Sequence, residues 1–202
     1  MRLAMVILTS ALTGLCFADR LVNVPTGRKL PFGSVRWETI FETQPHGDSE
    51  TYFDFGIGKS FEATYRSQQL PGTQKKTALD LSFNILSAIP DLAPGLAVGL
   101  QDIENSTLDG RRLYVALTNR PILSTVNGEV PADITLGGYI SGHSSFFVGI
   151  ALPFSQEFRL VVEHNGYRLT SGFELRPLPN VAFRWLIRDR QTLLSASLQA
   201  RF

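Results

Sequence analysis

The chain has 202 residues, of which 44% are hydrophobic, and a formal net charge of +1 at pH 7. This balance gives no electrostatic basis for nucleic-acid binding, which depends on an excess of Lys and Arg. The sequence has one cysteine, Cys16, so no internal disulfide holds the fold together.

Residues 1–18 predict an export signal that is removed from the mature protein. A positively charged start is followed by a largely apolar run over residues 3–15, which is too short to span a bilayer as a helix. Small residues around Ala18 fit a signal-peptidase site, so we expect cleavage there. A lipoprotein signal is the alternative because Cys16 closes the apolar run, although the preceding Leu15 is bulkier than such signals usually allow.

The mature chain is predicted to begin with a leading segment, residues 19–33, and to continue as strands over residues 34–202. Apolar and polar side chains alternate there, as for Leu79, Asp80 and Leu81, which places neighbouring residues on opposite faces of a strand. The alternation predicts about twelve strands, at residues 34–43, 51–58, 61–67, 77–85, 96–100, 113–117, 133–140, 146–152, 158–164, 167–176, 181–187 and 192–202.

Short connections between these strands favour antiparallel hairpins. Asn165 and Gly166 form the strongest hairpin signal because both residues tolerate positive φ. Two connections are longer, at residues 87–94 and 120–131, and the second has room for a further short hairpin. We therefore expect an all-β, antiparallel up-and-down barrel of roughly 10 to 14 strands.

Alternation occurs in soluble barrels and in membrane barrels, which differ in the face that is turned inward. Export favours a membrane barrel, and aromatic residues near strand ends, such as Trp37 and Trp185, suit interfacial girdles. Leu198 and Phe202 belong to a final alternating strand that resembles the assembly signal read by the barrel insertion machinery. We expect a bacterial outer-membrane protein surrounded by lipid, with a soluble periplasmic binding barrel as an alternative.

In such a barrel the apolar face contacts lipid and the polar face lines the lumen. The residues expected to face lipid include Leu79, Leu81, Phe83, Val98, Leu113, Val115, Val148, Ile150, Phe183 and Trp185. The polar residues expected to line the lumen are Arg36, Glu38, Asp54, Glu62, Arg66, Asp80, Arg112, Arg159, Glu163, Arg168, Glu174, Arg184 and Arg188. Acids dominate the first strands and arginines the last, so we expect ion pairs across the closure of the barrel. A hydrated pore is the alternative to a lumen filled by these pairs.

The sequence offers little for catalysis. His143 and Ser144 are the best candidates for a small lipid-modifying enzyme, the second functional hypothesis, but they fall in an expected tight turn without a third partner. Spacings typical of metal sites and glycine-rich phosphate loops are absent. We expect a non-enzymatic protein without metal or cofactor.

Three stretches carry a resemblance to a known family. Residues 94–102 (PGLAVGLQD) resemble a repeated strand motif of the YjbH-type exopolysaccharide-associated outer-membrane proteins, and residues 23–33 and 113–116 are similar to other parts of that family. Where the family has a Gly-Gly-Thr-Gly turn after the motif, this chain has residues 103–106 (IENS). The resemblance implies an outer-membrane barrel linked to exopolysaccharide export or envelope maintenance, with polysaccharide as a partner.

Overall fold

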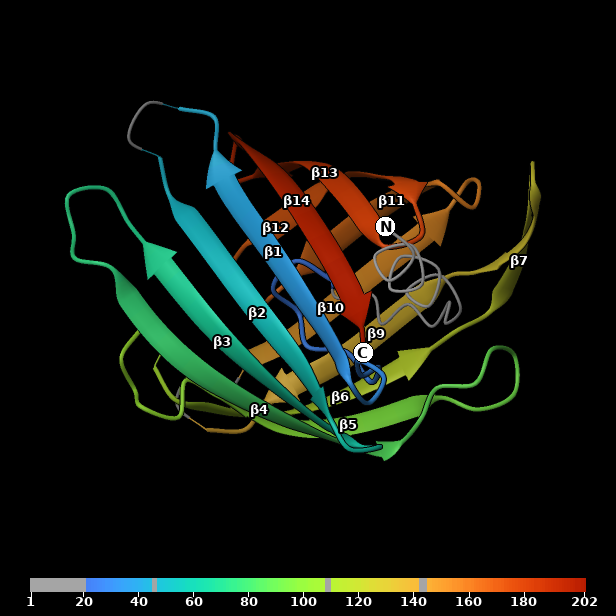
Figure 1. The fold of residues 1–202 in the computed structure, drawn as a ribbon, viewed down its shortest axis with the longest axis horizontal. Coiled ribbons are helices and arrows are strands. Elements are labelled where there is room, and N and C mark those ends of the chain that lie inside the picture. Colours follow the sequence, from blue (N-terminus) through green and yellow to red (C-terminus); the bar gives the residue numbers. More distant parts are fainter. Residues whose placement is uncertain (1–20, 45–46, 108–109, 142–144) are drawn as a thin grey trace, which may run out of the picture.

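The computed structural model describes residues 21–44, 47–107, 110–141 and 145–202. The expected signal peptide and the candidate residues His143 and Ser144 lie outside these ranges. Within them, twelve strands form a closed antiparallel barrel in which β1 pairs with β14 (Figure 1). The predicted all-β, up-and-down barrel is confirmed.

The strand bounds follow the predicted alternation closely. The strands of the barrel are β1 (Ser34–Glu42), β2 (Ser49–Ile57), β3 (Phe61–Gln69), β4 (Lys76–Leu86), β5 (Gly95–Gln101), β6 (Arg112–Asn119), β9 (Asp133–Tyr139), β10 (Ser145–Pro153), β11 (Phe158–His164), β12 (Leu169–Leu178), β13 (Val181–Arg188) and β14 (Gln191–Arg201). The long connection between β6 and β9 holds a separate hairpin of β7 (Ile122–Thr125) and β8 (Gly128–Pro131). Figure 1 shows β7 projecting beyond the ring, so this hairpin adds nothing to the barrel wall.

The barrel has its apolar side chains outside and its charged side chains inside. In β4, Leu79, Leu81 and Phe83 are exposed, whereas the alternating Asp80 and Ser82 are buried. The other residues expected to face lipid lie opposite apolar residues of neighbouring strands, on the same outer face. The pairs are Val98 with Phe83 and Val115, Leu113 with Leu100, Val148 with Leu136, Ile150 with Ile134 and Val162, Phe183 with Ala196, and Trp185 with Leu194. A soluble barrel requires the opposite polarity, which contradicts the soluble alternative. The described ranges contain no helix long and apolar enough to cross a membrane.

The two rims of the barrel differ in their connections. Gly33, just before β1, accepts a hydrogen bond from the Phe202 amide at 2.9 Å, so β1 begins and β14 ends at the same rim, called here the near rim. Antiparallel pairing places the long connections at residues 87–94 and 120–132 at the near rim as well. The turn at residues 165–168 lies at the opposite, far rim. Leu198 and Phe202 are both exposed, and their role in assembly stays a prediction.

Candidate functional site: the occupied lumen

Residues 21–33 lie inside the barrel, and this stretch is called here the lumen segment. Figure 1 shows it as the dark blue trace within the ring of strands. Leu21, Val22 and Val24 are buried and belong to one apolar cluster with Tyr52 and Leu186 of the wall. The sequence predicted a leading segment here but gave no sign that it occupies the lumen.

The barrel wall has glycines where the lumen segment passes closest to it. A Cβ atom on Gly95 of β5 would lie 2.5 Å from the carbonyl oxygen of Gly27, and one on Gly149 of β10 would lie 2.1 Å from Cδ1 of Leu21. Both distances are far below van der Waals contact, so a side chain at Gly95 would clash with the segment's backbone and one at Gly149 would require the Leu21 side chain to move. The wall is therefore shaped to the segment.

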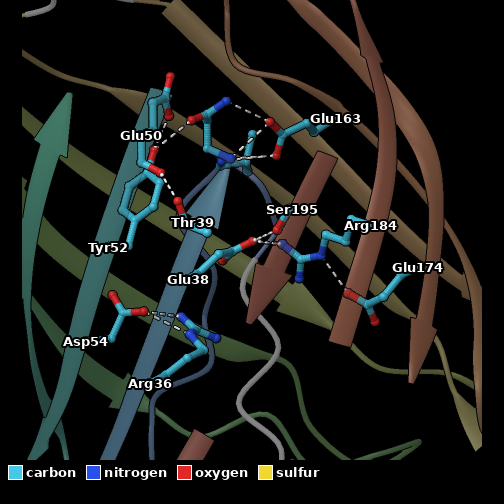
Figure 2. Close-up of polar contacts among 12 residues, drawn as sticks. Arg36, Glu38, Thr39, Glu50, Tyr52, Asp54, Glu163, Glu174, Arg184 and Ser195 are labelled. Atoms are coloured by element: carbon cyan, nitrogen blue, oxygen red, sulfur yellow. Dashed lines mark hydrogen bonds and ion pairs between the residues drawn. The ribbon is translucent and has the colours of Figure 1, made fainter. Parts of the chain in front are cut away.

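A buried carboxylate of β11 holds the start of the lumen segment. Glu163 accepts hydrogen bonds from the backbone amide of Asn23 at 2.9 Å and from that of Val24 at 3.2 Å, and Figure 2 shows it beside the segment. Further along, the Gly27 amide donates to Oγ1 of Thr118 on β6 at 2.7 Å. These bonds satisfy backbone donors that would otherwise be buried without partners.

Two more carboxylates hold the second half of the segment. Arg28 donates through Nη1 to Oδ2 of Asp133 at 2.8 Å, and Oδ1 of the same carboxylate accepts from Nε of Arg120 at 2.8 Å. The Leu30 amide donates to Oε2 of Glu62 on β3 at 2.8 Å. The sequence analysis did not select Asp133, although its place at the start of a predicted strand was a usable signal.

The predicted ion pairs across the closure of the barrel are present. Arg184 of β13 donates to Oε1 of Glu38 on β1 at 2.8 Å and to Oε2 of Glu174 on β12 at 2.7 Å (Figure 2). Ser195 of β14 adds a hydrogen bond to Glu38 at 2.7 Å, and Arg176 contacts Glu174 at 2.6 Å. Each buried charge in this group has an opposite charge beside it, as a low-dielectric interior requires.

Other predicted lumen residues form shorter-range pairs within the first four strands. Arg36 lies 2.8 Å from Oδ2 of Asp54, whose Oδ1 accepts from Thr64 at 2.6 Å. Arg66 lies 3.7 Å from Asp80. All of these side chains are buried inside the barrel, where their charges are balanced across neighbouring strands.

Glu50 is a lumen residue that the sequence analysis missed. It accepts from Arg188 at 3.2 Å and from the Tyr52 hydroxyl. The predicted strand began one residue after Glu50, whereas β2 begins at Ser49. Strand ends are the least certain part of a prediction from alternation, because a strand can continue past the last clear apolar residue.

Arg112 and Arg159 also lie inside the barrel, as predicted. The Arg112 guanidinium carbon is 4.4 Å from the centre of the Tyr139 ring, a cation–π contact. Arg159 is buried on β11 directly opposite Glu174 in the register.

Arg168 does not line the lumen, so its prediction was wrong. Its side chain is 55% exposed at the far rim, 3.5 Å from Asp189. The Asn165 side chain accepts hydrogen bonds from the amides of Tyr167 and Arg168 at 3.1 and 2.9 Å, which holds both residues in the turn. The strand expected from residue 167 therefore begins only at Leu169.

A polar cavity of about 50 Å³ remains between the segment and the wall, lined by residues that include Arg36, Glu62, Gln101 and Tyr114. This volume holds a few water molecules. In the parts of the chain that the structure describes, no group of His, Cys, Asp or Glu is arranged to hold a metal ion.

Asp102, the last residue of the motif at residues 94–102, orders the connection between β5 and β6. Its Oδ2 accepts from the amide and hydroxyl of Thr107 at 2.7 and 2.6 Å, and its Oδ1 accepts from the Ser106 amide at 2.9 Å. Burial alone would raise the pKa of Asp102, but the hydrogen bonds from Thr107 and Ser106 outweigh it and lower that pKa below its ordinary value. The charged form is thus bound more tightly in the folded loop.

We expect Asp102→Asn to open this loop at neutral pH, because an amide replaces one acceptor oxygen with a donor. Since the pKa of Asp102 is lowered on folding, its contribution is complete above the ordinary aspartate pKa and is lost as the pH falls through the lower folded value. Hydrogen exchange of the Ser106 and Thr107 amides measures the effect, and loss of one bond to a charged group corresponds to about 1.5 to 3 kcal/mol of protection. Glu104→Gln, at an exposed residue of the same loop, is the control. Equal protection in both variants would contradict the assignment.

The closed ring, the apolar outer face and the charged interior define a transmembrane β-barrel with an occupied lumen. No protein family and no curated protein matches the sequence. Solved structures of porins share the fold. A KdgM porin in complex with disordered oligogalacturonate matches with a TM-score of 0.52 and 12% identity, over 84% of this chain and 99% of that one. A NanC porin matches with a TM-score of 0.51 and 11% identity, over 83% of this chain and 98% of that one.

Proposed function

We propose that this protein is a non-enzymatic outer-membrane barrel that conducts or binds an oligosaccharide chain, and that the lumen segment closes it at rest. The observation that carries this proposal is the fit between residues 21–33 and the wall. Backbone donors of the segment meet acceptors of β3, β6 and β11, and glycines of the wall make room for it. A stretch of chain held in this way behaves as a plug that can be displaced.

Similarity in fold to two porins supports an outer-membrane location and a passage through the lumen. The resemblance of residues 94–102 to the YjbH-type proteins supports a role in exopolysaccharide export or envelope maintenance. For the alternative of a lipid-modifying enzyme, the candidates His143 and Ser144 fall outside the described ranges. No observation on the described residues favours that alternative.

The proposal predicts that Gly27→Leu opens the barrel. A Cβ atom on Gly27 would lie 2.6 Å from the carbonyl oxygen of Gly95, so a leucine cannot occupy this place and the segment must leave the lumen. In planar bilayers we expect the wild type to be nearly closed and Gly27→Leu to give a stable open-channel current. Gly138→Ala is the matched control, because a Cβ atom there meets nothing closer than 3.6 Å.

Heat-modifiable migration on a gel shows whether each variant has a folded barrel. A folded Gly27→Leu barrel that stays closed would contradict the proposed function.

A further inference from the structure

The carboxylates that hold the lumen segment differ from the other acids of the lumen in their partners. Within the described ranges, Glu163 and Glu62 accept hydrogen bonds only from the segment, at Asn23, Val24 and Leu30. Glu163 is 1% exposed. If the segment leaves, the half-buried Glu62 and the buried Glu163 lose every hydrogen bond they have to described residues. For Glu163 in particular, a buried carboxylate without donors is strongly unfavourable.

Most arginines of the lumen, by contrast, are neutralised by the wall itself. Arg184 lies between Glu38 and Glu174, and Arg36 lies against Asp54. Arg66 and Arg188 also have carboxylates of the wall as partners, Asp80 and Glu50. These pairs do not involve the segment, so they remain when it leaves. The charged groups of the wall that lose a partner are then the hydrogen-bond acceptors Glu62, Asp133 and Glu163.

The segment itself brings positive charge along this path. Arg28 contacts Asp133, and Lys29 follows it in the sequence. The contacts to acids are spread from Asn23 to Leu30, a stretch that spans at most about 25 Å if fully extended. The path therefore presents acceptors at intervals, which suits an extended polymer better than a single small molecule.

We propose that the path of the lumen segment is a binding site for an extended oligosaccharide that carries protonated amino groups, and that the segment holds the place of this ligand. The inference rests on the proposed function and names its substrate class. Ammonium groups supply hydrogen-bond donors in place of the Asn23, Val24 and Leu30 amides, and positive charge in place of Arg28. An acidic oligosaccharide would place carboxylates beside these carboxylates, and a neutral one would supply hydrogen-bond donors without replacing the positive charge of Arg28.

Isothermal titration calorimetry on the detergent-solubilised Gly27→Leu barrel tests this with matched hexamers of glucosamine, N-acetylglucosamine and galacturonate. We expect the glucosamine hexamer to bind most tightly and its binding to weaken as salt is raised. Adding Glu163→Gln should weaken it by about tenfold, which corresponds to about 1.4 kcal/mol, whereas Glu104→Gln on the exposed loop should leave it unchanged. If Gly27→Leu does not fold, Gly27→Ala places the same Cβ atom against Gly95 with a smaller side chain.

Binding is measured without any current, so this result is independent of whether the barrel conducts. If the Gly27→Leu barrel gives no current but still binds the glucosamine hexamer, the proposed conduction is wrong and the proposed class of ligand stands. Tighter binding of the galacturonate hexamer, or equal binding of the neutral one, would overturn the ligand class. A synthetic peptide of residues 21–33 that binds where no sugar does would also overturn it, because the site would then serve only the chain's own segment.

Discussion

Replacing Arg184 by leucine is expected to destabilise the folded barrel by about 3 to 5 kcal/mol, because Glu38 and Glu174 then stay buried without their shared counter-charge. The guanidinium lies 2.8 Å from one carboxylate and 2.7 Å from the other, and its side chain is 5% exposed. Water cannot easily take its place at such a depth. The shift of the urea midpoint for unfolding of the barrel in lipid vesicles measures the loss.

Arg168→Leu is the matched control for this experiment. Arg168 is paired with Asp189 at 3.5 Å, but both side chains are more than half exposed at the far rim. Exposed pairs of this kind contribute about 0 to 1 kcal/mol, because water screens them. Equal destabilisation by the two substitutions would mean that the lumen is far more hydrated than the ion pairs indicate. Removing Glu38 together with Arg184 should restore part of the loss, since one uncompensated charge is then gone.

Leu81→Arg is expected to destabilise the barrel in a bilayer by about 2 to 4 kcal/mol, the cost of a cation near the middle of a lipid-facing strand. Leu81 lies in the middle of β4 with its side chain exposed on the outer face, opposite Ala63 and Leu100. The free energy of unfolding in vesicles measures this cost. The destabilisation should be smaller in detergent micelles, where water reaches the side chain more easily.

Leu81→Met at the same position separates the charge from the change of shape. It conserves volume and hydrophobicity, so we expect it to cost less than about 1.5 kcal/mol. If Leu81→Arg is as harmless as Leu81→Met while Asp80→Leu unfolds the chain, the outer face does not contact lipid. Asp80 provides this comparison because it is the inward neighbour, bonded to the Asp102 amide at 2.7 Å.

The strands themselves were predictable from the sequence. Alternation such as that of Leu79, Asp80 and Leu81 depends on residues only two positions apart, so it appears in the sequence without knowledge of the fold. The same two-residue alternation predicts which side chains share a face of the sheet, and it placed Arg184 and Glu38 on the same face. Their pairing could be anticipated because the first and last strands of a closed barrel must meet.

Errors arose where a local feature ended or shifted a strand. The side chain of Asn165 holds Arg168 in the turn, and the strand that contains Glu50 extends beyond its clear apolar pattern. Asp133 was overlooked because its two arginine partners, Arg28 and Arg120, lie in segments without periodicity. Turn geometry and strand ends depend on individual hydrogen bonds, which alternation does not report.

The sequence by itself thus indicated about twelve antiparallel strands and the alternation of their two faces, because these follow from short-range periodicity and short connections. Which face is turned inward was decided only by the closed ring, since alternation is the same for either choice. The place of residues 21–33 was also decided by the tertiary structure. The contact between Asn23 and Glu163 joins residues 140 positions apart, and such a contact is defined only by the folded barrel, because no short-range pattern in the sequence connects the two residues.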